Sequence, residues 1–481
     1  MNIPVELRID KDEFADFAEL ENSLFEALME AGRGLFRAML SALDEKLLET
    51  RDQEVYRNKG LRKTCVKTRL GEVEYGRHVY EQRRADGSKR YVYLLDEVLG
   101  KQTIGTVSMT VCQMAAEAVA ESTYRSSSRQ VSEMTGLGLS HQGVWNIVQK
   151  LGEAREEEIE QQRVRAKAGQ GRGELASKIL YEEADGIWLK LQGADRKEKG
   201  AKAEMKLAIA YDGALWSTGK KRRTLDNKVA YASFEPAKEF MARKEGVIAD
   251  HYDVDEIELR VVNGDGAAWI KSGRDADGIY VLDEFHRNKA ITENVNDEDL
   301  RKTMRQLLYA GKIDDLLLCI EASIESTLDE QEQEKRRSLL AYFTSNKDGL
   351  TDYYHRGIAI PETRHKDVHH ARLGSMESNI FTIIGNRMKG RRACWSLRGA
   401  GNLARLLCLK HTTGYGHLFS RTETGRERKA LEEYHAPLSA GRIRKTVGRG
   451  YESPLQATTL CRTQRLKQIL APVPLSDLKI T

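Results

Sequence analysis

The amino-terminal part of the chain repeats apolar residues at helical spacing between Lys11 and Arg57. Two glycines, Gly32 and Gly34, interrupt the repeat, and a glycine inside a helix costs about 1 kcal/mol relative to alanine. The pattern predicts a helical hairpin over residues 1–60 that covers a core or pairs with a second subunit. Its apolar positions are Phe14, Phe17, Leu20, Leu24, Leu28, Leu35, Met39, Leu43 and Leu47.

The next part changes to the alternating pattern of β-strands. Alternation over 64–68, 71–81 and 90–94, with a turn at 85–88, predicts a small antiparallel β domain at 61–100. Basic residues flank that turn, and they either contact phosphates or are the ordinary charges of an edge strand. These residues are Arg83, Arg84, Lys89 and Arg90.

Residues 101–172 have helical periodicity, and one piece has the spacing of a helix-turn-helix. The pattern predicts a first helix at 124–135, a turn at 136–139 and a second helix at 140–151 that Ser140 caps. Polar residues early in such a second helix can face base edges in the major groove of DNA. His141, Gln142 and Asn146 occupy those positions. A plain pair of helices is the alternative interpretation.

The glycine-rich segment 169–173 leads into a region of strands, which we expect to form the first part of an α/β core at 173–290. Strands are predicted at 178–184, 187–192, 205–211, 229–234, 258–263 and 278–282, with a helix at 237–249. Strands that first meander and then alternate with helices fit a ribonuclease-H-like order.

The rest of the chain divides into three regions. An α-helical insertion is predicted at 291–370 and the remainder of the core at 371–415, where an amphipathic helix covers 398–410. Residues 416–481 form a basic carboxyl-terminal region. The fold class is therefore α+β and multidomain, with the ribonuclease-H-like core preceded by the helical and small β regions.

Three acidic residues stand at positions where they could meet. Asp265 follows a strand and precedes a helix, so it could bind a metal ion or simply cap that helix. Asp185 is predicted at the tip of a strand-turn-strand, and Glu377 in the first turn of a helix that begins with a Ser375 cap. This order of strand Asp, post-strand Asp and helical Glu is that of ribonuclease-H-like nucleases. Hard divalent ions in phosphoryl transfer need several such oxygen ligands.

The chain resembles the ISLre-type insertion-sequence DDE transposases, a group related to the Mutator-like transposases, over most of its length. The resemblance implies that Asp185, Asp265 and Glu377 bind two Mg²⁺ or Mn²⁺ ions. It also implies that Asp283 and His286 support the metal site or contact DNA, although a histidine near a strand end can be purely structural. The matching stretches are 183–186, 264–270, 282–286 and 374–377, followed by 388–391 and Trp395.

The charge is uneven along the chain. The net charge is only +4, but residues 385–470 hold 18 Lys plus Arg against 5 Asp plus Glu, which gives +13 locally and −9 elsewhere. Such an imbalance, with aromatic residues between the charges, favours double-stranded DNA as the partner. Guanidinium groups suit phosphate and an indole can stack on a base. The candidate contacts are Arg387, Lys389, Arg391, Arg392, Trp395, Arg442 and Arg444.

Composition narrows the class of protein further. The chain has 481 residues, of which 40% are hydrophobic and 31% charged, which is typical of a soluble globular protein with several domains. No apolar run reaches membrane-spanning length and the first residues lack a signal pattern, so we expect a cytoplasmic, nucleoid-associated protein. The six cysteines have neither zinc nor C-x-x-C spacing.

Together these features predict a DNA transposase that cuts at transposon ends and joins the freed 3′-hydroxyl to target DNA, acting as a homodimer or larger oligomer. A tyrosine recombinase is the alternative, since 369–372 read His-His-Ala-Arg and Tyr415 or Tyr434 could be its nucleophile. That interpretation leaves the three acidic positions unexplained. A third interpretation is a DNA-binding regulator that has lost catalysis.

Overall fold

The computed structural model describes residues 16–84, 87–216, 223–271 and 278–412. Contacts divide the chain into two compact units. The first takes in the described residues up to Ala118 and Thr123–Val144, and the second takes in Val119–Ser122 and the described residues from Trp145 onward. The two units are therefore treated separately.

A single long helix, α1 (Phe17–Thr50), begins the first unit. The expected helical hairpin is wrong, because the helix continues through both glycines. A Cβ on Gly32 would lie 3.3 Å from the side chain of Leu70, so this glycine allows close packing of the helix on the neighbouring β-hairpin. The carboxyl-terminal half of α1 packs on the sheet through Leu40 and Leu47.

The small sheet of the first unit has the order β3-β2-β1-β5-β4. Its main strands are β1 (Tyr56–Thr68), β2 (Gly71–Arg83) and β3 (Lys89–Val92), and they pair antiparallel as the alternation predicts. The short strands β4 (Thr103–Ile104) and β5 (Val107–Ser108) complete it. Tyr80 and Val92 are buried on the face toward α1.

Helices follow this sheet as expected. They are α2 (Leu94–Val98), α3 (Met109–Glu121), α4 (Tyr124–Thr135) and α5 (His141–Lys167). Gly136 ends α4 in the left-handed region, with φ +65°. The two predicted helices and the break between them are thus confirmed, although the second helix is much longer than predicted because the charged stretch after it continues the same helix. Their interpretation as a DNA-binding helix-turn-helix stays a prediction.

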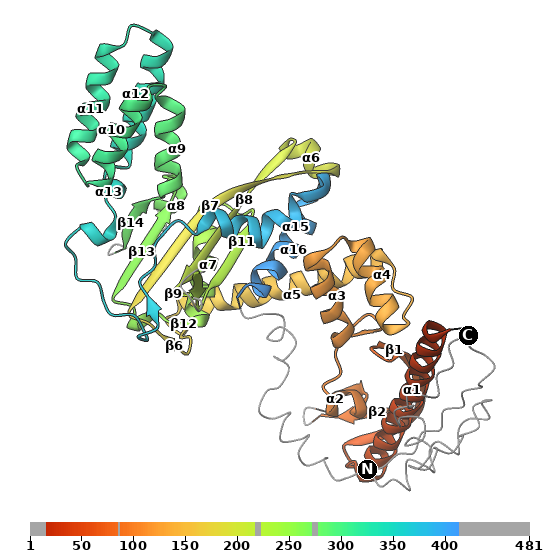
Figure 1. Ribbon diagram of the computed structural model, residues 1–481. Coiled ribbons are helices and arrows are strands. Elements are labelled where there is room, and N and C mark those ends of the chain that lie inside the picture. Colours follow the sequence, from red (N-terminus) through yellow and green to blue (C-terminus); the bar gives the residue numbers. More distant parts are fainter. Residues whose placement is uncertain (1–15, 85–86, 217–222, 272–277, 413–481) are drawn as a thin grey trace, which may run out of the picture. The chain divides into compact units, whose positions relative to one another are not determined.

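The second unit is built on a five-stranded sheet with the order β11-β8-β7-β13-β14. The strands are β7 (Ile179–Lys190), β8 (Lys202–Tyr211), β11 (Val229–Ser233), β13 (Leu259–Gly264) and β14 (Ile279–Leu282). The first three pair antiparallel, whereas β13 is parallel to both β7 and β14. Numbered along the chain, the order across the sheet is third, second, first, fourth, fifth. Figure 1 shows α7 (Ala237–His251) and α16 (Leu397–Lys410) beside this sheet.

The helical insertion follows β14 and forms a bundle that Figure 1 shows in green to teal. Its helices are α9 (Glu284–Asn294), α10 (Glu298–Tyr309), α11 (Ile313–Ser326), α12 (Glu330–Ser345) and α13 (Lys347–Leu350). The prediction of helix as far as residue 370 is wrong. Residues 351–375 contain only a 3-10 turn (Tyr353–His355) and β15 (Val368–His369), which pairs with β9 (Gly213–Trp216).

After this connection the chain forms α14 (Met376–Asn379), a π-helical stretch (Ile380–Gly385) and α15 (Asn386–Met388), followed by a 3-10 turn (Gly390–Arg392). The remaining short elements are β6 (Leu175–Ala176), α6 (Gly193–Lys199), β10 (Arg223–Asp226), β12 (Tyr252–Asp253), a 3-10 turn (Val254–Glu256) and α8 (Ala268–Lys271). Across the described ranges, every helix is too short or too polar to cross a membrane.

Candidate functional site

A small hollow at one edge of the five-stranded sheet collects the acidic residues singled out in the sequence. Asp185, Asp265 and Glu377 line it together with Asp283 and His286. The lining is completed by Ala184, Asn263, Gly264 and Met376. The cavity measures about 10 Å³, which is roughly room for one water-sized sphere. Segments nearly 200 residues apart therefore bring their carboxylates to one place.

Asp185 lies inside a strand and not at the tip of a turn. The register of β7 with β8 is unbroken from Tyr181 to Lys190, so the expected strand-turn-strand is wrong. The Asp-Gly pair has the composition of a turn, but both of its residues pair with β8 as the rest of the strand does. The Gly186 N–H donates to Oδ1 of Asp185 at 2.6 Å.

Asp265 makes the hydrogen bond expected of a helix cap, and its side chain also lines the hollow, where metal binding stays a prediction. It directly follows β13, and its Oδ1 accepts the Ala267 N–H at 2.8 Å, as a cap would. The same side chain lines the hollow. Its carbonyl oxygen accepts the hydroxyl of Tyr342 at 2.6 Å, and Tyr342 belongs to α12. The helical insertion is therefore bonded to the backbone of the site.

Glu377 is held through its backbone by a buried acid that the sequence analysis missed. The carboxylate of Glu183 accepts the N–H groups of Gly374, Ser375 and Met376 at 2.9–3.2 Å. Ser375 occupies the predicted N-cap position of α14, but its side chain makes no cap hydrogen bond and instead accepts from Arg223 at 2.8 Å. Glu183 thus links the strand of Asp185 to the helix of Glu377.

Glu183 is fully buried and has two further donors. Tyr211 donates its hydroxyl, and the Asn263 amide donates at 3.1 Å. Burial raises the pKa of Glu183, whereas the hydrogen bonds from Tyr211, Asn263 and Gly374 lower it. The Asn263 amide also donates to Oδ2 of Asp283 at 3.0 Å. The sequence held one signal for the role of Glu183, which is its place on a strand among apolar residues. A buried acid in such a strand needs hydrogen-bond partners.

Asp283 and His286 belong to the first turn of α9. Asp283 caps this helix by accepting the His286 N–H at 3.2 Å. The Nε2 of His286 lies 3.7 Å from Oδ2 of Asp185. The interaction with Asp185 raises the pKa of His286, burial opposes it, and the charges of Asp283 and Asp265 add to the rise. His286 is thus placed against the acids.

The donor atoms suit a hard divalent ion better than a soft one, because four carboxylates and one imidazole line the hollow and no thiol does. In the arrangement described here, no three Asp, Glu, His or Cys side chains among the described residues are close enough to hold one ion. An ion in the hollow would therefore have to draw side chains inward. If the side chains move inward in this way, the residue types and the size of the space fit Mg²⁺ or Mn²⁺.

The candidate DNA contacts separate into exposed and buried residues. His141, Gln142 and Asn146 are exposed on α5, and Lys389 and Arg392 are exposed beyond α15. Trp395 is only 8% exposed, and its Nε1 donates to the Met388 carbonyl oxygen at 2.9 Å. Base stacking by Trp395 is therefore wrong, because its ring is part of the core. The side chain of Arg391, together with Arg442 and Arg444, lies outside what the structure describes.

The side chain of Arg387 also makes its contacts within the protein. Its Nε donates to the Val119 carbonyl oxygen at 2.6 Å, and its guanidinium lies over the Trp395 ring, 5.4 Å from the centroid. A phosphate contact by Arg387 would require breaking both interactions, so this prediction is wrong for the arrangement described.

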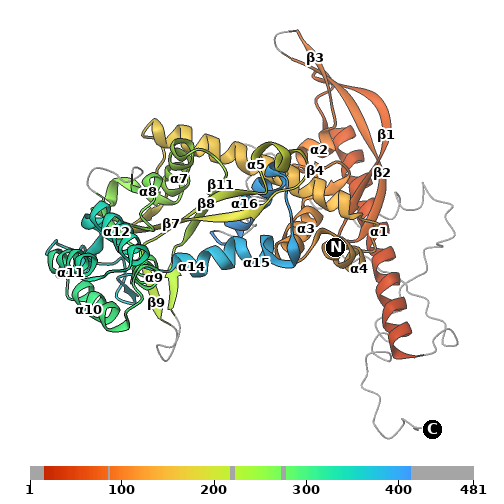
Figure 2. The ribbon, with the colours of Figure 1, turned by 90° about the horizontal axis from the view of Figure 1, so that it is seen from above.

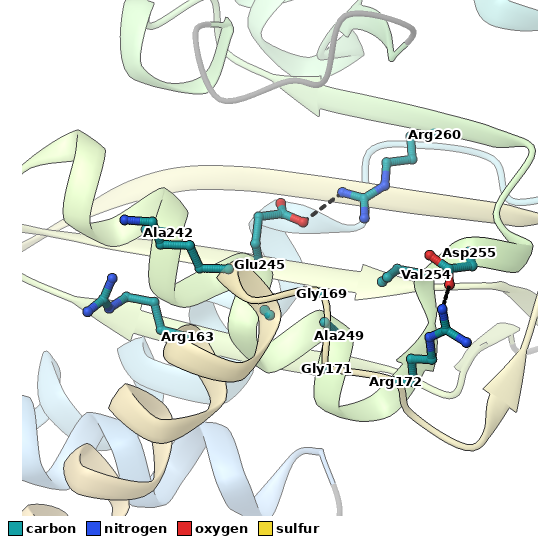
Figure 3. A pocket seen from close by; sticks show the side chains of 12 residues that line it. Arg163, Gly169, Gly171, Arg172, Ala242, Glu245, Ala249, Val254, Asp255 and Arg260 are labelled. Atoms are coloured by element: carbon teal, nitrogen blue, oxygen red, sulfur yellow. Dashed lines mark hydrogen bonds and ion pairs between the residues drawn. The ribbon is translucent and has the colours of Figure 1, made fainter.

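A larger hollow of about 290 Å³ lies near the opposite end of β13, between α5 and α7 (Figure 3). Ion pairs occupy its walls, with Arg260 bound to Glu245 and Arg172 bound to Asp255. Behind them Lys244 bonds both Glu182 and Glu245. Because these charges satisfy one another, the small hollow is the better candidate for chemistry.

Fold and site together define a mixed α/β protein whose sheet edge carries a carboxylate-lined hollow. The chain belongs to UPF0236, an uncharacterised protein family, whose model matches residues 10–423. A protein named for its position in the vanSb 3′ region of Streptococcus gallolyticus is 24% identical over 81% of this chain and 82% of its own length. A UPF0236 protein of Caldanaerobacter subterraneus subsp. tengcongensis is 27% identical over 81% of this chain and 77% of its own length.

These comparisons correct the assignment made from sequence. Both the family model and these two relatives carry the name UPF0236, and neither relative's name mentions transposition. Membership of the ISLre-type transposases is therefore wrong, and what the comparisons show is a family of uncharacterised function.

Proposed function

We propose that this protein is a metal-dependent enzyme that cleaves DNA strands and transfers the freed 3′ ends to target DNA, the activity of a transposase. The observation that carries the proposal is the meeting of Asp185, Asp265 and Glu377 in one hollow. Phosphoryl transfer on DNA needs this kind of donor set, because the attacking and leaving oxygens both carry developing charge.

The sheet supports the proposal. Its order is third, second, first, fourth, fifth, with an acid inside the first strand and another after the fourth, which is the arrangement that the proposed ribonuclease-H-like core would need. Ligands of open α/β sheets bind outside the carboxyl ends of the parallel strands. Asp265 and Asp283 follow such ends directly, after β13 and β14. In this proposal the helical insertion separates the last strand from the Glu377 helix.

In the proposed reaction, the oxygen of a water molecule attacks a phosphorus of the DNA backbone and the bond to the 3′ oxygen breaks. The released 3′-hydroxyl then attacks a phosphodiester of the target, forming one bond to phosphorus and releasing a second 3′-hydroxyl. Two bound divalent ions would lower the pKa of the attacking group and stabilise the leaving oxygen. Asp185, Asp265 and Glu377 would bind these ions, and no covalent link between protein and DNA is formed.

The surrounding residues hold the carboxylates in place. Glu183 fixes the backbone that carries Glu377, and Asn263 ties Glu183 to Asp283. His286 lies against Asp185, and its protonated form would offset the repulsion among the acids. Partners of this kind typically change metal affinity or activity 10–100-fold when they are removed.

The names of the relatives add independent support. One Caldanaerobacter relative, 26% identical over 401 residues, has a name that joins eleven locus designations, and another joins four. One protein assigned to many loci of a genome is the outcome expected when a gene is copied to new places. Transposition of the DNA that encodes it would produce this pattern.

The test is cleavage of DNA that carries the regions flanking the gene, with Mg²⁺, with Mn²⁺ and with EDTA. Cleavage should require the metal and be lost in Asp185→Asn, Asp265→Asn and Glu377→Gln, while DNA binding persists. Glu258→Gln is the matched control, because it removes an exposed acid whose partner is Lys178. Full cleavage in EDTA, or in any of the three variants, would overturn the proposal. A covalent protein–DNA adduct on denaturing gels would instead indicate a tyrosine recombinase.

A further inference from the structure

The antiparallel ribbon of β1, β2 and β3 is a strongly basic part of the chain, remote in sequence from the residues of the hollow. Residues 56–92 contain 11 Lys and Arg against four Asp and Glu, a net charge of +7. Since the whole protein carries only +4, the rest of the chain is net acidic by three charges. An imbalance this local on so short a segment marks a surface for a polyanion.

Strand pairing gathers these charges on one face of the ribbon. Arg57 pairs with Glu81 and Glu81 with Tyr91, while Arg83 pairs with Lys89 two residues further along. Side chains on alternate residues share a face, so these five lie together. Arg62 pairs with Arg77 beyond a register shift between Asn58 and Leu61, and its side chain is exposed further along the same ribbon. The opposite face packs on α1 through Tyr80 and Val92. On the charged face Glu81 itself is buried, whereas Arg57, Arg83, Lys89 and Tyr91 are exposed.

Three of the five cations of this face form no ion pair with acids of the described residues. Lys59 and Lys89 both pair with Glu81, at 2.9 and 3.6 Å. Within the described ranges, the side chains of Arg57, Arg62 and Arg83 form no ion pair, and all three are exposed. Tyr91 stands beside them with 68% of its surface exposed. Unpaired guanidinium groups next to an exposed ring are suited to phosphate and to a stacked sugar or base.

The dimensions of the ribbon fit duplex DNA. Arg57 and Arg62 pair with Glu81 and Arg77, which are four residues apart on β2. This is about 13 Å along a strand, and over that length one DNA strand presents roughly four phosphates. Figure 2 shows the ribbon curving beyond α1 and α2, with β3 toward its end.

We propose that this ribbon face, made of Arg57, Lys59, Arg62, Arg83, Lys89 and Tyr91, binds the phosphate backbone of double-stranded DNA. The inference rests on DNA being the substrate of the proposed enzyme. It assigns the ribbon sequence-independent contacts, because guanidinium groups that reach phosphates carry no information about the bases. Of the two open interpretations of the basic residues around the turn, phosphate contact is therefore favoured over simple edge-strand charge.

The experiment measures the affinity of the full-length protein for a duplex of about 30 base pairs in EDTA, over a series of salt concentrations. The variant Arg57→Gln/Arg62→Gln/Arg83→Gln should bind at least tenfold more weakly and lower the salt dependence of binding by about three units of slope, roughly 0.9 for each phosphate contact. The loss should be equal on flanking and random sequences. Arg57→Lys/Arg62→Lys/Arg83→Lys should keep most of the slope.

The matched control is Lys302→Gln/Lys335→Gln/Arg337→Gln, which removes the same charge from exposed positions of α10 and α12. An unchanged slope in the ribbon variant, or an equal loss in this control, would overturn the inference while leaving the proposed function in place. If the ribbon variant weakens DNA binding but the wild type never cleaves DNA, the inference stands and the proposed function fails. Wild-type binding to an acidic protein or to RNA but not to duplex DNA would overturn both.

Discussion

Replacing Glu183 with glutamine should weaken metal binding in the hollow, although Glu183 is not one of the residues that line it. The Glu183 carboxylate accepts three backbone N–H groups at the start of α14, together with Tyr211 and Asn263. A glutamine amide keeps one acceptor oxygen and points two N–H groups at the remaining donors. We therefore expect the loop before Glu377 to lose its anchor on β7.

The magnitude follows from the number of donors left without a partner. Each buried group that loses its acceptor costs about 1–3 kcal/mol, and at least two do so in Glu183→Gln. We expect the free energy of unfolding to fall by about 3–5 kcal/mol, as it does when one partner of a buried charged network is removed. Displacement of Glu377 should raise the Mn²⁺ concentration needed for half-saturation about 10-fold to 100-fold.

Glu182→Gln is the control, because Glu182 is the adjacent residue on β7 and is also buried, but it bonds Lys244 and Arg260 on the other side of the sheet. This variant should lose similar stability and leave Mn²⁺ binding unchanged. The measurements are Mn²⁺ titration of folded protein and hydrogen exchange of the Ser375 and Met376 amides. Equal Mn²⁺ affinity in the two variants, or exchange at 375–376 that is unaffected by Glu183→Gln, would refute this reasoning.

Three further outcomes follow from single contacts. Trp395→Phe should lower the free energy of unfolding by about 1 kcal/mol or more and leave DNA affinity unchanged, which thermal melts and binding assays will show. Tyr342→Phe should reduce strand cleavage, with a stability loss of about 1 kcal/mol, because it frees the Asp265 carbonyl. Burial raises the pKa of Glu245, but the charges of Lys244 and Arg260 outweigh burial and bring it from 4.5 to about 2. The stability from Glu245 is thus present above pH 4.5 and lost toward pH 2, so acid unfolding curves of Glu245→Gln should be flatter over that range.

The apolar pattern predicted most elements of the core because their periodicity is strong. The strands after residue 173, the helix at 237 and the helix at 397 are all present. Errors occurred where local composition competes with tertiary packing. The Asp185-Gly186 pair looks like a turn, yet β8 pairs along its whole length. Gly32 looks like a helix break, yet it permits contact with Leu70.

The acidic lining of the hollow was largely predictable because Asp265, Asp283 and Glu377 stand beside a strand end or a helix start, whereas Asp185 lies inside β7. The residues that hold this lining in place were not predictable from the sequence. Glu183 and Asn263 act through partners 20 to 193 residues away, and spacing along the chain holds no information about such contacts. Trp395 shows the converse, since an aromatic residue among arginines suggested a DNA surface, but its ring is buried.

The most direct test of the account is the anomalous scattering of Mn²⁺ in crystals of the wild-type protein. The account predicts a peak in the hollow with oxygens of Asp185, Asp265 and Glu377 at about 2.0–2.3 Å, the distance expected of hard divalent ions. It also predicts that this peak disappears in Asp265→Asn. Manganese bound only elsewhere, or a peak that survives this substitution unchanged, would contradict the assignment of the hollow as a metal-dependent active site.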